Sequence, residues 1–154
     1  MSAVIVSLRV PASPEEAFDI FTGEISAWWR PSALFQLTPR GDGTLSFEGE
    51  ARLITTLASG KVFEIGRVTA WQRGQRLAFS WRQATFTPDQ VTSVEVAFEA
   101  VGEDTRVTVT HRGWDSIPQE HVARHGFPLS ATQMRLAEYW RAQLVSLSQA
   151  RKSR

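Results

Sequence analysis

Apolar and polar residues alternate in the first segment of the chain, VIVSLRV at residues 4–10. Strict alternation places the apolar side chains on one face, which predicts a half-buried β-strand. Residues 12–21 follow and predict a short helix with an apolar side. Ser13 is a candidate N-cap, Pro14 suits the first helical position, and Glu16 completes a capping box three residues after the serine.

A second short helix is predicted for ISAWW, residues 25–29. Pro31 disfavours helical geometry at Arg30, so we expect this helix to end there.

The middle of the chain, from about residue 45 to residue 112, predicts a run of about six antiparallel strands. The segments with strand patterns are TLSFEGEARLITTL (44–57), GKVFEIGRVTAW (60–71), RLAFSWR (76–82), TSVEVAFEAV (92–101) and TRVTVTHRG (105–113). Turn signals separate them: RGDG, ASG, QRGQ, TPDQ and GEDT. In the last two segments every second residue points inward, which predicts a hairpin with Phe98 and His111 on the buried face.

The C-terminal part of the chain has a helical period instead. Ser130 and Gln133 form a second capping box, which predicts a helix from about residue 131 to residue 151. An apolar stripe recurs along it at three- and four-residue spacing and must face something apolar: Leu136, Trp140, Leu144 and Leu147. Residues 151–154, RKSR, are expected to be a frayed tail.

This order of elements predicts an α+β fold in one domain, residues 1–154. A curved antiparallel sheet of about six to seven strands would wrap around the long terminal helix. Such a sheet holds the helix away from part of its concave face, and the gap can be a pocket.

Composition narrows the possible partners. The chain has 17 basic and 16 acidic residues and a net charge of +1, which provides no electrostatic footprint for nucleic acid or anionic membrane. It contains no cysteine, so disulfides and thiolate metal sites are excluded. No segment has the pattern of a signal peptide or the roughly 20 apolar residues of a membrane span. We expect a cytoplasmic protein.

Five segments resemble a known family in their order along the chain. They are V.ASPEEAF (10–18), WWRP (28–31), GRVTAWQRGQRLAFSW (66–81), TRVTVTHRGW (105–114) and WRAQLVSL (140–147). The chain resembles the activator of 90-kDa heat-shock protein ATPase homologue family. That family belongs to the START-like (SRPBCC) helix-grip superfamily, with the birch-pollen-allergen-like proteins and polyketide cyclases. The resemblance implies a helix-grip fold with an apolar cavity between sheet and terminal helix, but fold alone does not select an activity.

The final helix departs from the family pattern at one position. The family often has a glycine before the tryptophan and leucines four and seven residues after it. Trp140, Leu144 and Leu147 match, but Tyr139 stands at the glycine position. We therefore expect a pocket that is smaller or more polar at that end.

The tryptophan pair Trp28-Trp29 closes one end of the cavity in the arrangement that the resemblance implies. Adjacent helical residues point about 100° apart, so the two rings cannot face the same way. We expect one to fill the core beneath the sheet edge and the other to lie at the cavity entrance. The spacing does not say which.

The candidate ligand-binding residues are aromatic side chains and one histidine on the faces that point inward. Plain core packing is the alternative for each of them, although a buried indole N–H needs a partner and suits a pocket wall. The candidates are Trp28, Trp29, Phe79, Trp81, Phe98, His111, Trp114, Tyr139 and Trp140.

The histidines raise the question of catalysis and metal binding. His111 faces inward, either as a satisfied core group or as a hydrogen-bonding handle or general base that Tyr139 could assist. His121 and His125 are four residues apart, but Val122 occupies the position where a zinc protease has its glutamate, and no third ligand is near. We expect no metal and no cofactor.

The favoured function is binding of a hydrophobic or aromatic small molecule, lipid-like or polyketide-like, between the sheet and the terminal helix. One alternative is a polyketide cyclase- or lyase-type enzyme that uses the same cavity. Another is a chaperone ATPase-activating partner that acts through its surface. No nucleophile elbow or paired carboxylates indicate a conventional enzyme, so we lean against enzymatic activity. The sequence leaves open whether the protein forms a homodimer.

Overall fold

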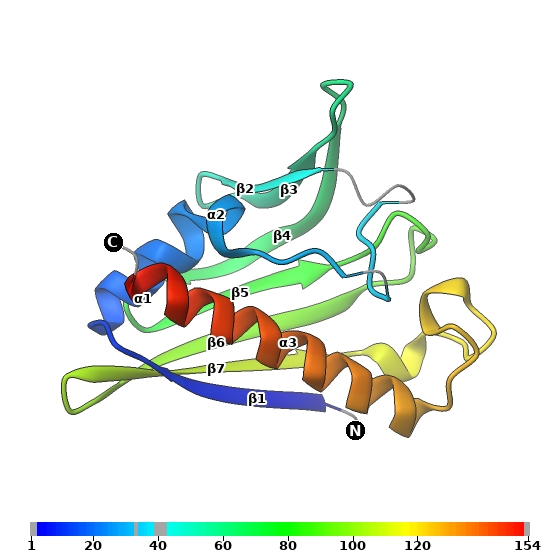
Figure 1. Ribbon diagram of the computed structural model, residues 1–154. Coiled ribbons are helices and arrows are strands. Elements are labelled where there is room, and N and C mark those ends of the chain that lie inside the picture. The colour runs from blue at the N-terminus through cyan, green and yellow to red at the C-terminus, as the bar shows by residue number, and fades with distance from the viewer. Residues whose placement is uncertain (1–2, 33, 39–42, 153–154) are drawn as a thin grey trace.

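A curved antiparallel sheet with a long helix lying across it dominates the computed structural model, which describes residues 3–32, 34–38 and 43–152 (Figure 1). The strand order is β1-β7-β6-β5-β4-β3-β2. The strands are β1 (Ala3–Val10), β2 (Thr44–Glu48), β3 (Arg52–Thr56), β4 (Val62–Gln72), β5 (Arg76–Trp81), β6 (Thr92–Val101) and β7 (Asp104–Arg112). The predicted α+β fold and its strand number are confirmed.

Three helices and two short 3₁₀ turns complete the fold: α1 (Pro14–Gly23), α2 (Ile25–Trp28), η1 (Trp114–Ser116), η2 (Val122–Arg124) and α3 (Leu129–Lys152). Figure 1 shows α3 crossing the sheet, with α1 and α2 beside its C-terminal half. None of the helices in the described ranges is both long enough and apolar enough to cross a lipid bilayer.

The strand pairing follows the alternation of apolar residues. In the predicted β6–β7 hairpin, which is confirmed, Val94 lies opposite His111 and Phe98 opposite Val107. The segment 44–57, read as one piece in the sequence, forms two strands because the chain turns back at Gly49, where φ is 57°. Most of the turn expected at residues 40–43 lies outside the described residues.

Two register shifts bend the sheet, one between Leu53 and Ile54 and one in β4 just after Val68. Irregularities of this kind increase the local twist of a strand. Gly66 in β4 lies where β5 approaches closely, because a Cβ at this position would come within 1.6 Å of the Ser80 carbonyl oxygen. The curvature therefore requires a residue without a side chain here.

Helix α1 begins as predicted. Ser13 Oγ accepts a hydrogen bond from the Glu16 N–H at 3.2 Å, with proline in the first turn. Helix α2 ends at Trp28 instead of Arg30, because Trp29 is already extended, with φ −63° and ψ 131°.

Helix α3 buries the predicted stripe, since Leu136, Trp140, Leu144 and Leu147 are all at most 1% exposed. Its limits differ from the prediction. It begins at Leu129, so Ser130 lies inside the first turn and is not the N-cap. It also continues through residue 152, where a frayed tail was expected. Arg151 Nε donates to Glu16 Oε1 at 2.8 Å and ties this end to α1. Residues 153–154 lie outside the described part.

Candidate functional site

The segment after α2 is held against α3 by two buried polar side chains. Gln143 Oε1 accepts from the Arg30 N–H at 2.8 Å, and Gln143 Nε2 donates to the Arg30 carbonyl at 2.6 Å. Ser146 Oγ donates to the Trp28 carbonyl. Together these bonds satisfy backbone groups that the early end of α2 leaves open. Gln143 and Ser146 lie beside the apolar stripe, and nothing in the helical period indicates their role.

The two neighbouring tryptophans have different surroundings. Trp28 is buried in the core, and its Nε1–H donates to the Ile20 carbonyl at 3.0 Å. Trp29 is half-buried, and its ring contacts Trp81 and Trp140 at centroid distances of 5.7 and 5.6 Å. Trp28 is therefore the core member of the pair, and Trp29 is the member that lines a cavity between α3 and the segment after α2.

His111 is the centre of a hydrogen-bonded chain inside the core. Trp140 Nε1–H donates to Nδ1 at 3.0 Å, so the neutral ring carries its proton on Nε2. Nε2–H then donates to Thr92 Oγ1 at 2.8 Å, and the Thr92 hydroxyl donates to the Trp81 carbonyl at 2.9 Å. Trp114 Nε1 lies 3.3 Å from the same Nε2, but a protonated Nε2 cannot accept its hydrogen.

Burial lowers the pKa of His111 from its ordinary 6.5 to about 3. The ring is neutral at pH 7, and both of its nitrogens are occupied by protein groups. These contacts support the interpretation of His111 as a core side chain with satisfied hydrogen bonds. Neither of its ring nitrogens is free to exchange a proton with a substrate.

A cavity of about 170 Å³ lies between β2, β3, α3 and the segment that follows α2. Its described lining residues are Ser26, Trp29, Pro31, Ser32, Phe35, Gln36, Leu37, Thr38, Gly43, Thr44, Leu45, Thr55 and Tyr139. The floor is buried, with Phe35, Leu45 and Tyr139 as its apolar side chains. The rim is exposed at Ser26 and Gln36, so the cavity opens to solvent.

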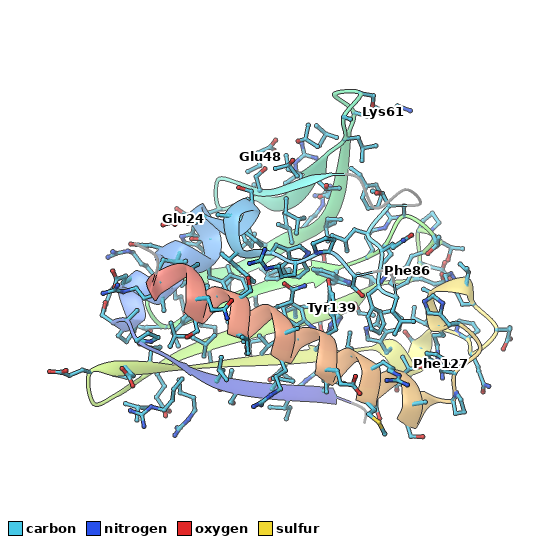
Figure 2. All side chains as sticks on the ribbon, viewed as in Figure 1. Glu24, Glu48, Lys61, Phe86, Phe127 and Tyr139 are labelled. Atoms are coloured by element: carbon cyan, nitrogen blue, oxygen red, sulfur yellow. The ribbon has the colours of Figure 1, made fainter. Side chains whose placement is uncertain are left out.

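Tyr139 forms the wall of this cavity on the helix side. Its ring contacts Phe35 and Trp29 at centroid distances of 5.2 and 5.8 Å, and in Figure 2 it lies on the side of α3 that faces this segment. Burial raises the pKa of its hydroxyl above the ordinary value of 10. Tyr139 and Phe35 also line an outer hollow of about 530 Å³, so their rings separate the two spaces.

The proposed proton-transfer pair of His111 and Tyr139 is not assembled. In the described chain no hydrogen bond or ring contact joins them, and Trp140 contacts both at centroid distances of 6.0 and 5.9 Å. Nor do three or more His, Asp or Glu side chains gather anywhere among the described residues in a way that could hold a metal ion.

The structure places the nine candidate residues in two groups. Trp29 and Tyr139 line the cavity. The other seven are at most 6% exposed and belong to the core: Trp28, Phe79, Trp81, Phe98, His111, Trp114 and Trp140. Their role as ligand contacts stays a prediction. Several lining residues were missed. Phe35, Leu37 and Thr38 lie in a segment without a period, whereas Leu45 and Thr55 lie in predicted strands whose alternation does not show which of their residues reach a cavity.

A curved antiparallel sheet around a long C-terminal helix, with two short helices after the first strand, defines a helix-grip protein. The family model described as "Activator of Hsp90 ATPase homolog 1-like protein" matches residues 11–142. The chain belongs to this family, as its motifs predicted.

Solved structures share the fold. The Aha1 dimer from Colwellia psychrerythraea is 19% identical with a TM-score of 0.63, covering 97% of this chain and 96% of that one. An HSP90 activator from Plasmodium falciparum is 18% identical with a TM-score of 0.58, covering 91% and 88%. DynU16, a putative protein in the dynemicin biosynthetic locus, is 21% identical with a TM-score of 0.66, covering 99% of this chain and 48% of that one. Curated proteins yield no match.

Proposed function

We propose that the protein binds a small apolar or aromatic molecule in the cavity lined by Trp29, Phe35 and Tyr139. The observation that supports this function is the combination of a buried aromatic floor with a rim that opens to solvent. Ligand sites are concave and mostly apolar, with a few polar groups that orient the ligand. The lining combines apolar and aromatic side chains with six serine, threonine and glutamine residues, so it is more polar than a typical site of this kind.

The volume limits the size of the ligand. An apolar cavity of about 150 Å³ accommodates benzene, and this one has about 170 Å³. It is smaller than the roughly 300–1,000 Å³ of sites for larger ligands. A one-ring compound therefore fits, whereas the lipid-like or polyketide-like ligand expected from the sequence requires Tyr139 and Phe35 to move apart.

The same size sets the expected affinity. A buried aromatic ring removes roughly 150–250 Å² from water. At about 25 cal/mol per Å² this contributes about 4–6 kcal/mol, before the cost of association. The corresponding dissociation constants are about 40 µM to 1 mM, and the cost of association weakens them further. The assay must therefore detect weak binding.

Titration of ¹⁵N-labelled protein with toluene, followed by NMR, tests the proposal. We expect saturable shifts of amides in segment 29–38 and in β2 and β3. A Leu45→Trp substitution should abolish them by filling the floor. Leu34→Trp is the matched control, since Leu34 lines neighbouring hollows instead. The absence of shifts in the wild type, or their persistence in Leu45→Trp, contradicts the proposal.

A chaperone-activating role is the second candidate. It is supported by the family and by the likeness to the Plasmodium falciparum HSP90 activator. The measurement is the ATPase rate of a purified 90-kDa chaperone with and without the protein. A rise that Leu45→Trp leaves unchanged would assign the activity to the outer surface, and an unchanged rate would remove this candidate. Sedimentation velocity in the same buffer would show whether the protein dimerises.

A further inference from the structure

Two threonine hydroxyls at the cavity have no hydrogen-bond partner among the described residues. Six threonines in the described chain are buried: Thr22, Thr38, Thr55, Thr92, Thr105 and Thr132. Four of them hydrogen-bond through their hydroxyls, for example Thr105 to the Ala12 carbonyl at 2.7 Å. Thr38 and Thr55, which are 6% and 2% exposed, form no side-chain hydrogen bond within the described residues. These two are also the buried threonines that line the cavity.

A hydroxyl without a protein partner remains available to hydrogen-bond with water or with a ligand. Both of these hydroxyls belong to residues that line one cavity open to solvent, so a molecule inside it can replace water as their partner. A hydroxyl both donates and accepts, so a neutral hydroxyl or carbonyl group satisfies it.

Gly43 keeps one of these hydroxyls accessible. A Cβ at this position would come within 2.1 Å of Thr55 Oγ1 and 3.3 Å of Thr55 Cβ. Any side chain at this position would therefore crowd the Thr55 hydroxyl.

The charge of the lining restricts the ligand further. All thirteen described lining residues are uncharged. A carboxylate buried against them would lose its hydration without gaining an opposite charge. A neutral polar group loses much less hydration free energy when it is buried there.

We infer that the ligand is a neutral one-ring aromatic compound bearing a hydroxyl or carbonyl group, which hydrogen-bonds with Thr38 and Thr55 while its ring packs on Trp29, Phe35 and Tyr139. This inference rests on the proposed function and specifies its ligand. Phenol is the simplest probe with this chemistry, and toluene has the same ring without the polar group. Benzoate has the ring with a full negative charge.

The test compares the dissociation constants of these three probes by NMR titration of the wild type and of Thr38→Val, Thr55→Val and the double variant. Valine keeps the shape of threonine and removes the hydroxyl. We expect each single substitution to weaken phenol binding about 3- to 10-fold, the range for loss of one hydrogen bond, and to leave toluene binding unchanged or tighter. Benzoate should bind the wild type at least about tenfold more weakly than phenol. Thr56→Val is the matched control, because consecutive strand residues point to opposite faces.

The outcomes separate the two proposals. If the wild type binds neither toluene nor phenol, the proposed function fails and this inference fails with it. If toluene binds but the substitutions change phenol and toluene equally, the inference about the polar group is wrong and the cavity function stands. Binding of benzoate as tight as that of phenol would also overturn the neutral ligand class.

Discussion

The buried histidine makes a quantitative prediction about stability and pH. His111 accepts from the Trp140 N–H through Nδ1 and donates through Nε2 to Thr92. A second proton would have to enter at Nδ1, where it would displace the Trp140 hydrogen bond and place a charge in the core. This is the physical reason why the pKa of His111 falls to about 3 in the folded protein.

The sign and size of this pH dependence follow from the linkage between proton binding and folding. An unfolded chain binds a proton at this histidine near pH 6.5, whereas the folded chain binds it only near pH 3. The stabilising contribution of the neutral ring is therefore fully present above pH 6.5 and decreases as the pH falls toward 3. Each pH unit costs about 1.4 kcal/mol. Between pH 7.5 and pH 5.0 the loss is about 2 kcal/mol.

Urea denaturation of the wild type and of His111→Gln at both pH values measures this loss. The variant lacks the titrating ring and keeps every other ionisable group, so the difference between the two pH dependences isolates His111. We expect the wild type to lose about 2 kcal/mol more than the variant between pH 7.5 and 5.0. Equal losses in the two proteins would refute the reasoning.

If the His111→Gln variant does not fold, a second measurement on the wild type tests the same reasoning. The His111 ring signals should show no titration between pH 8 and pH 5 by NMR. A midpoint near 6.5 would contradict the buried neutral ring.

Three further substitutions test other parts of the fold, each by urea denaturation followed by circular dichroism. Ser13→Ala removes the N-cap of α1 and should lower the free energy of unfolding by about 1 kcal/mol, while an unchanged value would show that the cap is dispensable. Gly66→Ala places a methyl group within 1.6 Å of the Ser80 carbonyl and should destabilise by more than about 3 kcal/mol; a wild-type transition would disprove the close approach of the two strands. Gln143→Leu leaves the Arg30 backbone groups without partners and should cost about 1–3 kcal/mol, and no loss would mean that water replaces the glutamine.

The parts of the fold that sequence predicted are those set by local periodicity. The alternation in β6 and β7 determined both the hairpin and the inward direction of His111. The stripe of α3 likewise identified its buried face. The hairpin of β2 and β3 was read as one piece, because the polar turn around Gly49 interrupts the alternation only briefly.

A cavity between the sheet and the terminal helix was expected, but most of its lining could not be predicted, because residues around it meet across long sequence separations. Gln143 binds the Arg30 backbone 113 positions away, and on its own helix it reads as one polar residue beside an apolar stripe. Segment 34–38 has neither helical nor strand geometry, so no period indicated that Phe35 or Thr38 faces inward. Trp29 and Tyr139 were identified from their size and from the family pattern.

Three of the six tryptophans explain why the cavity is small. Trp81, Trp114 and Trp140 surround His111 and fill the space between the sheet and the middle of α3. Tyr139 then closes the remaining space against Phe35. The chain thus combines a solid aromatic core with one residual opening beside Thr38 and Thr55. Under the proposed function, Tyr139 limits the size of the ligand, while Thr55 in the sheet and Thr38 in the segment that crosses it select its polarity.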